Sequence, residues 1–312
     1  MPAPLLPRVL VTGADGLVGQ AVVGHLAAWP DADLLATGRD AEPRARPPAG
    51  GYAPLDVTDA AAVERAFLDF APNVVVHAAA ESRVEACEAE RERAWAVNVD
   101  ATAELAARCH RHGARLVLLS TDFLFDGTAG PYTEDDRPAP VNAYGRSKLA
   151  AENAIRRSGL QRWAIVRTSM VFGVGTGLAR PNVGTMLVRE LSAGRSFLAA
   201  ADQLRTPTYA PDLAEGLARI VRYGKDGVFH LAGRERLSVF AFARRLAACC
   251  GLDPALVHPT TTAALHPDAP RPLNGGLVIL RAEAELGFRP RPLDAACSHF
   301  LRNLAISPVG SA

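Results

Sequence analysis

The chain of 312 residues lacks the features that mark membrane, metal-binding and nucleic-acid-binding proteins. No apolar run approaches the ~18 residues that a membrane-spanning helix needs. Its charges nearly cancel, with 34 Lys and Arg against 33 Asp and Glu, so it has no electrostatic footprint for nucleic acid or an acidic membrane surface. No His and Cys residues have the spacing of metal ligands, and we therefore expect no metal site.

Cysteine is scarce as well. There are five cysteines, an odd number, and no C-x-x-C pair. The neighbours Cys249 and Cys250 fit helix packing better than a redox centre. The first residues lack a basic segment followed by an apolar core and a cleavage site. These features predict reduced thiols and a cytoplasmic location.

Short apolar segments alternate with segments of helical periodicity in the first half of the chain. Strands are expected at residues 8–13, 33–38, 52–56, 73–80, 115–121 and 163–169. Helices are expected at residues 16–29, 61–70, 93–113 and 142–159, and a Pro-rich loop at 42–51. This alternation predicts an α/β fold, a doubly wound parallel sheet of the Rossmann type with helices on both faces.

The pattern changes after residue 170, where Gly and Pro become frequent. Further helices are expected at 184–194, 211–222 and 238–250, with one strand at 227–233 and a polar loop at 258–276. We therefore predict a dinucleotide-binding domain at residues 1–170, with 205–233 threading back into it. A smaller mixed α/β subdomain for substrate binding would occupy mainly residues 171–312.

Three glycines follow the first expected strand in a G-x-x-G-x-x-G pattern. Glycines there allow a tight turn and a close approach of the backbone to a pyrophosphate, while the helix N-terminus offers free N–H groups. A purely structural turn is the alternative for three glycines alone, but the place at the first strand–helix junction favours a dinucleotide. The predicted cofactor contacts are Gly13, Asp15, Gly16, Leu17, Val18 and Gly19.

The end of the second expected strand indicates which dinucleotide binds. Arg39 stands where an acidic residue would accept hydrogen bonds from a ribose hydroxyl. A guanidinium can hold a 2′-phosphate, so NADP (NADPH) is preferred. Asp40 follows directly, and NAD stays possible. Asp56 and Val57 would meet the adenine, and the small residues after the fourth strand would line the cofactor unless they serve only tight packing: Ala78, Ala79 and Ala80.

A hydroxyl, a phenol and an amine complete the predicted site. Thr121 and Asp122 end a parallel strand, and Tyr144 and Lys148 lie one helical turn apart. The phenol could protonate a carbonyl oxygen as hydride reaches the carbon. A free phenol has a pKa of about 10. A lysine cation and the positive cofactor ring would lower that pKa, while Thr121 orients the carbonyl. A solvated lysine and a half-buried tyrosine are the alternatives. His77 fits a packed core histidine better than a base.

The order of these motifs resembles the extended short-chain dehydrogenase/reductases, most closely the dTDP-4-dehydrorhamnose reductase family. The similar segments are "STDFLFDGTAGPYTEDDRPAPVNAYGRSKLAAE" (120–152), "VRTSMVFG" (166–173), "DQLRTPT" (202–208) and "RPLN" (271–274). The resemblance covers nearly the whole chain. It implies NAD(P)H-dependent reduction of the 4-keto group of a nucleotide-linked 6-deoxyhexose.

The resemblance also implies roles for particular residues. Thr121 supplies the hydroxyl, Tyr144 the proton and Lys148 the cation, with Asp122 beside them. The residues implied near the sugar are Val84, Glu85, Asp122, Phe123 and Met170, with Arg271 and Asn274 closing over the substrate. Further implied cofactor contacts are Asn98, Ser120, Tyr144, Lys148 and Arg167.

Three positions depart from the family pattern. Met170 replaces a usual tryptophan, Phe123 a tyrosine and Gly275 a serine. All three are expected near the substrate, so the sugar is less defined than the chemistry. Rival interpretations are an epimerase, a dehydratase, which needs a glutamate after Asp122, and a non-catalytic NADP-binding subunit like that of methionine adenosyltransferase. A homodimer is a further possibility.

Overall fold

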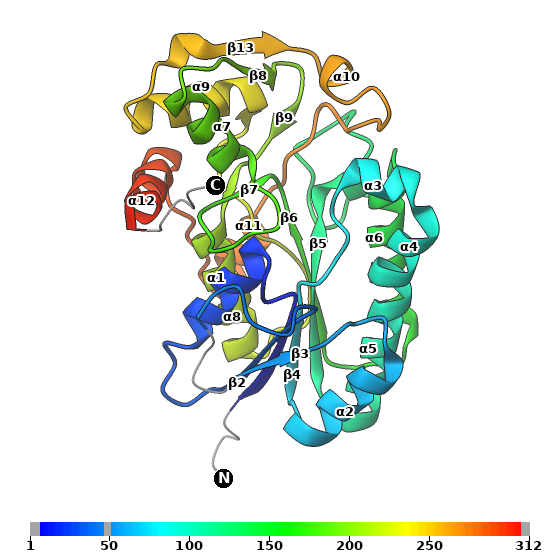
Figure 1. Cartoon of the computed structure of the whole chain (residues 1–312). Coiled ribbons are helices and arrows are strands. Elements are labelled where there is room, and N and C mark those ends of the chain that lie inside the picture. Colours follow the sequence, from blue (N-terminus) through cyan, green and yellow to red (C-terminus); the bar gives the residue numbers. More distant parts are fainter. Residues whose placement is uncertain (1–6, 47–50, 307–312) are drawn as a thin grey trace.

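A seven-stranded parallel sheet forms the centre of the protein (Figure 1). The computed structural model describes residues 7–46 and 51–306. The strand order is β11-β6-β5-β4-β1-β2-β3, and every neighbouring pair is parallel. The strands are β1 (Arg8–Thr12), β2 (Asp33–Gly38), β3 (Tyr52–Pro54), β4 (Val74–His77), β5 (Arg115–Thr121), β6 (Trp163–Thr168) and β11 (Gly227–His230).

Helices cover both faces of the sheet, as the predicted Rossmann-type fold requires. Side chains of β1 alternate between them: Val9 and Val11 join one apolar core, and Leu10 joins the other. One face carries α1 (Leu17–Leu26), α8 (Ala210–Tyr223) and α11 (Leu280–Leu286), and the other carries α2 (Ala60–Phe70), α5 (Ala101–His112) and α6 (Ala143–Arg157). Burial on both faces explains the continuous apolar runs of the strands.

A smaller part lies above the carboxyl ends of the strands (Figure 1). Phe172, Phe242 and Phe300 form the centre of its separate apolar core. Its helices are α7 (Val183–Ser192), α9 (Val239–Cys249), α10 (Thr262–Leu265) and α12 (Leu293–Ile306). Its short strands pair as β7 (Val171–Phe172) with β10 (Thr208–Tyr209), β9 (Leu204–Arg205) with β12 (Leu237–Ser238), and β8 (Phe197–Ala200) with β13 (Val257–Thr260).

The chain returns from the smaller part to the sheet twice. Helix α8 and strand β11 form the first return, and both lie within the predicted segment 205–233. Helix α11 forms a second return that the sequence did not predict. The division of the chain at residue 170 itself stays a prediction. Of the predicted loop 42–51, residues 47–50 lie outside the described residues.

Two predicted elements are wrong in detail. The expected helix 93–113 is broken into α4 (Arg91–Trp95), a π-helical turn (Ala96–Asp100) and α5. The widened turn buries Asn98, and such bulges occur mostly at functional sites. The expected polar loop 258–276 contains most of β13 and all of α10, because backbone pairing with β8 overrides its proline content.

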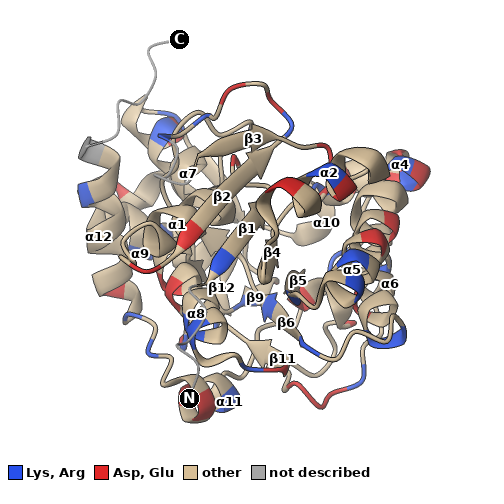
Figure 2. Cartoon of the chain, turned by 90° about the horizontal axis from the view of Figure 1, so that it is seen from below, with Lys and Arg blue, Asp and Glu red and all other residues tan. Residues whose placement is uncertain are grey.

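Positive and negative residues are interspersed over the helices seen in Figure 2, including both signs on α4. This mixture agrees with the small net charge of +1. None of the helices among the described residues has the length and apolar character to cross a membrane.

A buried carboxylate joins α6 to two strands of the sheet. Glu152 is fully buried and accepts two hydrogen bonds from Arg167 of β6, at 3.0 and 2.8 Å. Ser120 of β5 donates a third, at 2.7 Å. Burial raises the pKa of Glu152, but these donors outweigh it and hold the pKa below its usual range. Because α6 also carries Tyr144 and Lys148, the network fixes their height against the sheet.

Replacing Glu152 should destabilise the fold strongly. Glu152→Gln leaves the buried Arg167 cation without its anion, which should lower the free energy of unfolding at pH 7 by about 3–5 kcal/mol. The difference from the unchanged protein should shrink as the pH falls below the ordinary glutamate value of 4.5, because the depressed pKa stabilises only the ionised native state. Guanidinium denaturation at pH 7 and pH 4 measures both effects.

Arg156→Ala is the matched control. Arg156 also binds Glu152, at 3.0 Å, but a third of its side chain is exposed. Its loss should change the free energy of unfolding by about 1 kcal/mol or less. Equal effects of the two variants would contradict the assignment of the stabilisation to the buried pair.

Candidate active site

The glycine loop forms a cradle between β1 and α1. A Cβ at Gly13, whose φ is +70°, would lie 2.5 Å from the Ala79 nitrogen, and one at Gly19 would lie 2.1 Å from the Gly13 oxygen. At Gly16 a Cβ would meet only the Gly13 oxygen at 3.4 Å, so the space in front of the helix is open. No side chain caps α1 at its N-cap Gly16. This geometry fits a dinucleotide pyrophosphate held by backbone N–H groups, including those of Leu17 and Val18.

The cradle lies where the strand order reverses. Strand β1 is flanked by β2 on one side and β4 on the other, and open α/β sheets bind ligands at such a point. Ala78 and Ala79 are half-buried and Ala80 is exposed beyond the end of β4, beside the glycines. Their small side chains leave the edge of the cradle accessible.

The buried Asn98 fixes the loop after β4. Its amide donates to the Glu81 carbonyl oxygen and to the Ser147 hydroxyl, both at 2.9 Å, and its oxygen accepts from the Glu81 nitrogen at 2.9 Å. The side chain therefore ties this loop to α6, next to Lys148. A direct cofactor contact of Asn98 stays a prediction.

Several charged side chains surround the end of β2. Arg39 is exposed there, and Asp40 pairs with Arg44 at 2.6 Å. The Asp15 carboxylate accepts from the Tyr52 hydroxyl and the Arg44 nitrogen, both at 3.0 Å. Arg44 thus adds a second guanidinium near Arg39, which was predicted to hold a 2′-phosphate, and a phosphate contact of either residue stays a prediction.

Asp56 and Val57 lie beyond β3. Thr58 donates two hydrogen bonds to Asp56, at 2.9 and 2.7 Å. These bonds, together with the charge of Arg39, lower the pKa of Asp56. Val57 is buried. Contacts of the two residues with adenine stay a prediction.

Thr121 and Tyr144 meet at the end of β5. Asn142 caps α6 by accepting from the Gly145 nitrogen at 2.8 Å, which starts the helix one residue before Tyr144. A Cβ at Gly145 would lie 2.2 Å from the Phe123 oxygen, so the first turn presses against the chain leaving β5. The phenol consequently lies close enough to the Thr121 hydroxyl for that hydroxyl to lower its pKa.

Burial dominates the titration of the two helix residues. It raises the pKa of Tyr144 to about 12, against the lowering effects of the Thr121 hydrogen bond and the Arg180 charge. Lys148 is only 2% exposed, and burial lowers its pKa to about 8 although Glu152 opposes the change. Taken together, the protein's own groups raise the pKa of the phenol, and the sequence had predicted a lowering. A net lowering would depend on the positive ring of a bound cofactor.

His77 is a core residue, as the sequence favoured. It is fully buried, and its ring nitrogens lie 2.7 Å from the Thr12 hydroxyl and 3.2 Å from the Thr102 hydroxyl. Burial, together with the charge of Lys148, lowers its pKa to about 3, so the ring is neutral.

Asp122 is buried beside Arg205, a residue that the sequence did not single out. Its carboxylate accepts from the Ser169 hydroxyl at 2.6 Å and lies 3.6 Å from the Arg205 guanidinium, which is equally buried. Phe123 packs edge-on against Tyr144, with 5.7 Å between ring centroids. The carboxylate of Asp122 is therefore engaged with partners, and a direct catalytic role stays a prediction.

The residues predicted to contact the sugar have different surroundings in the structure. Glu85 is exposed and pairs with Arg271, and His266 contacts both side chains. Asn274 instead donates to the Thr128 oxygen at 3.0 Å, on the neighbouring loop. Among the others, Val84 is buried in α3 (Val84–Ala89), and Met170 packs against the smaller core with a positive φ of 38°. Sugar contacts from all these residues stay predictions.

Ser120 and Arg167 were predicted to contact the cofactor. Both side chains are buried in the ion-pair network of Glu152, as described above. The network gives them a structural role, and a cofactor contact from either stays a prediction.

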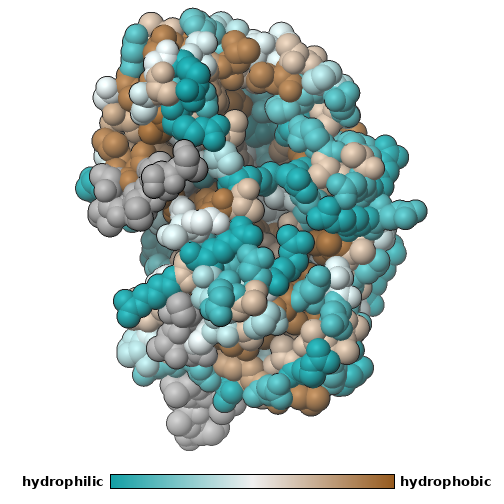
Figure 3. All heavy atoms as spheres, viewed as in Figure 1, coloured by the Kyte–Doolittle hydropathy of each residue, from teal (hydrophilic) through white to brown (hydrophobic). Residues whose placement is uncertain are grey.

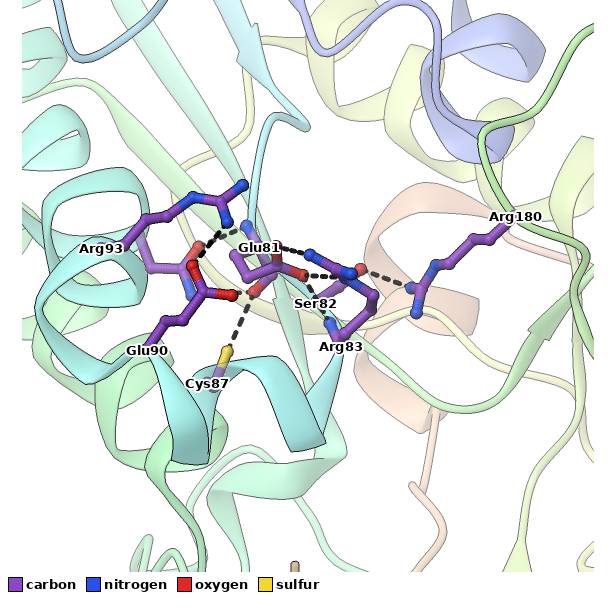
Figure 4. Close-up of polar contacts among 8 residues, drawn as sticks. Glu81, Ser82, Arg83, Cys87, Glu90, Arg93 and Arg180 are labelled. Carbon is purple, nitrogen blue, oxygen red and sulfur yellow. Dashed lines mark hydrogen bonds and ion pairs between the residues drawn. The ribbon is translucent and has the colours of Figure 1, made fainter.

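The loop at 173–182 crosses the cradle. Gln20 of α1 exchanges hydrogen bonds with the backbone of Thr176, at 2.7 and 2.8 Å. At the other end, Arg180 donates to the Ser82 hydroxyl at 2.6 Å. Figure 4 shows Arg180 reaching across to Ser82, beside the Glu81–Arg83 pair. The surface below the smaller part is hollowed and rimmed by hydrophilic residues (Figure 3).

A family model described as the RmlD substrate binding domain matches residues 7–306. The chain belongs to this family. It is 36% identical over 271 residues to a dTDP-4-dehydrorhamnose reductase of Mycobacterium tuberculosis, covering 85% of this chain and 82% of that protein. It is also 33% identical over 289 residues to methionine adenosyltransferase 2 subunit beta of Rattus norvegicus, covering 91% and 84% of the two chains.

A solved structure agrees with this membership. The dTDP-4-dehydrorhamnose reductase of Bacillus anthracis, in complex with NADP, superposes with a TM-score of 0.82 and 25% identity, covering 95% of this chain and 99% of that one. The family resemblance predicted from the motifs and the Rossmann-type fold are both confirmed.

Several residues at the site were not predicted from the sequence. Glu152 had a usable signal, because it follows Tyr144 and Lys148 at intervals of one helical turn on the same face. Arg44 lies four residues after Asp40, also a readable spacing. Arg180 and Arg205 had no local signal, since tertiary contacts alone bring them to the site.

Replacing Arg39 should change the choice of cofactor. Arg39→Ser should weaken NADPH binding roughly 10- to 100-fold, because a charge-assisted hydrogen bond contributes about 1.5–3 kcal/mol, and NADH binding should change little. Fluorescence titration with both cofactors measures the two dissociation constants. Arg65→Ser, an exposed arginine on α2, is the control. An equal loss for NADPH and NADH would exclude a 2′-phosphate contact.

Proposed function

We propose that this chain reduces the 4-keto group of a nucleotide-linked 6-deoxysugar, with NADPH preferred over NADH. The observation that carries the proposal is the placement of the Tyr144 phenol near enough to the Thr121 hydroxyl for that hydroxyl to lower its pKa, with Lys148 one helical turn away. A proton donor, an orienting hydroxyl and a cation at the strand ends suit reduction of a carbonyl. Membership of the family and similarity to dTDP-4-dehydrorhamnose reductases support the same reaction.

Each residue of the site has its own role in the proposed reaction. NADPH in the glycine cradle would supply a hydride to the carbonyl carbon. The Tyr144 hydroxyl donates its proton to the carbonyl oxygen, and its raised pKa keeps that proton in place at neutral pH. Thr121 hydrogen-bonds the same oxygen and orients it. The Lys148 cation stabilises the phenolate that remains until solvent returns the proton.

The arrangement speaks against a dehydratase. A dehydratase needs free acidic groups after the hydroxyl, whereas Asp122 is held by Ser169 and Arg205 and is followed by Phe123. An epimerase would hold the cofactor reduced in its first half-reaction until the second half-reaction oxidised it again, so it would cause no net oxidation of NADPH. A nucleotide sugar is the partner that the family relationship supports; a homodimer and a cytoplasmic location stay predictions.

Removing the phenol hydroxyl tests the reductase directly. With a mixture of nucleotide-linked 4-keto-6-deoxysugars, Tyr144→Phe should lower the rate of NADPH oxidation by about 10²- to 10⁴-fold, because the proton donor is lost. NADPH binding should stay within a few-fold of the unchanged protein. Absorbance at the NADPH band and titration of NADPH fluorescence measure the two quantities.

Tyr223→Phe is the control, because this tyrosine is exposed at the end of α8. Tight NADPH binding without turnover of any keto-sugar by the unchanged protein would favour a regulatory subunit, in line with the similarity to methionine adenosyltransferase 2 subunit beta. Unchanged turnover in Tyr144→Phe would remove Tyr144 from the mechanism.

The reaction should also slow at alkaline pH. The pKa of Lys148 is about 8, so the ammonium loses its charge as the pH rises through that value. The value of kcat/KM for the keto-sugar, which reports groups of the free enzyme, should therefore fall above about pH 8. In Lys148→Arg the residual activity should lack this decline, because a guanidinium stays charged. A profile that is flat up to pH 10 in the unchanged protein would contradict the assignment.

A further inference from the structure

Arg205 is among the largest fully buried side chains of the protein. It belongs to β9 in the smaller part, is 2% exposed, and lies beside the catalytic strand end. Its guanidinium donates to the Pro272 oxygen at 2.7 Å and to the Leu204 oxygen at 3.1 Å. Two segments of the smaller part thus hold the head group in one orientation.

The buried charge of Arg205 is directed at the chain that leaves β5. Its Nε lies 3.6 Å from the Asp122 carboxylate, and its Cζ lies 5.0 Å from the centre of the Phe123 ring. Arg271 stands 5.8 Å from the same ring and carries a like charge. Because a buried cation is costly without an anion, Asp122 is its natural counter-ion.

Gly275 makes room for this guanidinium. A Cβ at position 275 would lie 2.1 Å from the Arg205 Nη1 atom and 3.2 Å from its Cζ. The φ angle of Gly275 lies outside the left-handed region, so an alanine would be acceptable to the backbone itself. The obstacle to a side chain at 275 therefore includes the arginine head group.

Phe123, which contacts Arg205, also contacts Thr121 and Tyr144, the two residues with the proposed reacting hydroxyls. Phe123 packs edge-on against Tyr144, with 5.7 Å between centroids. The Phe123 nitrogen also donates to the Thr121 hydroxyl at 3.2 Å. A shift of Asp122 and Phe123 would consequently displace Thr121 and Tyr144 relative to each other.

We propose that Arg205 is a positioning residue for the reduction: with Gly275 leaving it space, it holds Asp122 and Phe123 and thereby aligns Thr121 with Tyr144. This inference rests on the proposed function. Arg205 acts through these neighbours, because its guanidinium is buried and lies over the Phe123 ring. The smaller part thus contributes to the geometry of proton transfer as well as to the covering of the site.

A double-variant cycle tests the proposal. Gly275→Ala removes no atom of the site but forces the guanidinium out of place. It should lower kcat by about 10- to 100-fold, since a misplacement near 1 Å has effects of this size. The KM for NADPH and the melting temperature should change little. Arg205→Met should give a similar loss, and Arg205→Lys a partial recovery.

The decisive variant combines the two changes. If Gly275→Ala acts by displacing Arg205, then adding it to Arg205→Met should lower kcat no further. Gly24→Ala is the control for replacing a glycine, because a Cβ at position 24 of α1 meets nothing within 4 Å. Where Arg205→Met fails to fold, Gly275→Ala and Arg205→Lys still provide the comparison.

Three results would overturn the inference. The first is an unchanged kcat in Gly275→Ala, and the second is a kcat in the double variant that falls below that of Arg205→Met by as much as Gly275→Ala alone lowers it. The third is a fall in kcat that is accompanied by equally large falls in NADPH affinity and in melting temperature. The outcomes are distinct from those for the proposed function. An unchanged protein that reduces no keto-sugar overturns the reductase itself, whereas a working reductase that tolerates Gly275→Ala overturns only the role of Arg205.

Discussion

The buried carboxylate of Glu152 is the constraint on which the site depends. It is the point where β5, β6 and α6 are joined by charge rather than by apolar packing alone. Apolar attraction is not directional, whereas a bidentate ion pair adds a preferred geometry that fixes the helix against the strands. Tyr144 and Lys148 lie two turns and one turn before Glu152 on the same helix, so their positions follow from this pair.

The same burial that fixes these residues also sets their protonation. Lys148 is held near Glu152, yet burial lowers its pKa, and the neighbouring phenol keeps a high pKa. A phenol that stays protonated is suited to donate a proton when negative charge develops on a substrate oxygen. Arg180, on the loop that crosses the cradle, contributes a positive charge that lowers the pKa of the phenol. Charged groups from both parts of the chain thus influence the pKa of the Tyr144 phenol.

Periodicity and motif order were sufficient to predict the first part of the fold. The seven strands of the sheet and the glycine cradle have local signals, because each depends on residues close in sequence. The π-helical turn around Asn98 had none, since an extra residue in a helix leaves the apolar pattern almost unchanged. The hydrogen bond between Arg180 and Ser82 and the ion pair between Arg205 and Asp122 join residues far apart in sequence, and only folding brings them together.

Two departures from the family pattern acquire a common physical explanation through Arg205. Phe123 offers an aromatic face to a cation, and Gly275 removes the side chain that would occupy the same space. A phenol ring at 123 would add a hydroxyl and a serine at 275 would add a Cβ, so each substitution reshapes the surroundings of one buried guanidinium. Such a cation needs a fixed anion, and Asp122 supplies it from the residue directly after Thr121. The counter-ion of the smaller part is therefore also the neighbour of Thr121, the proposed catalytic hydroxyl, and the proposed role of Arg205 would couple substrate-side packing to the geometry of reduction.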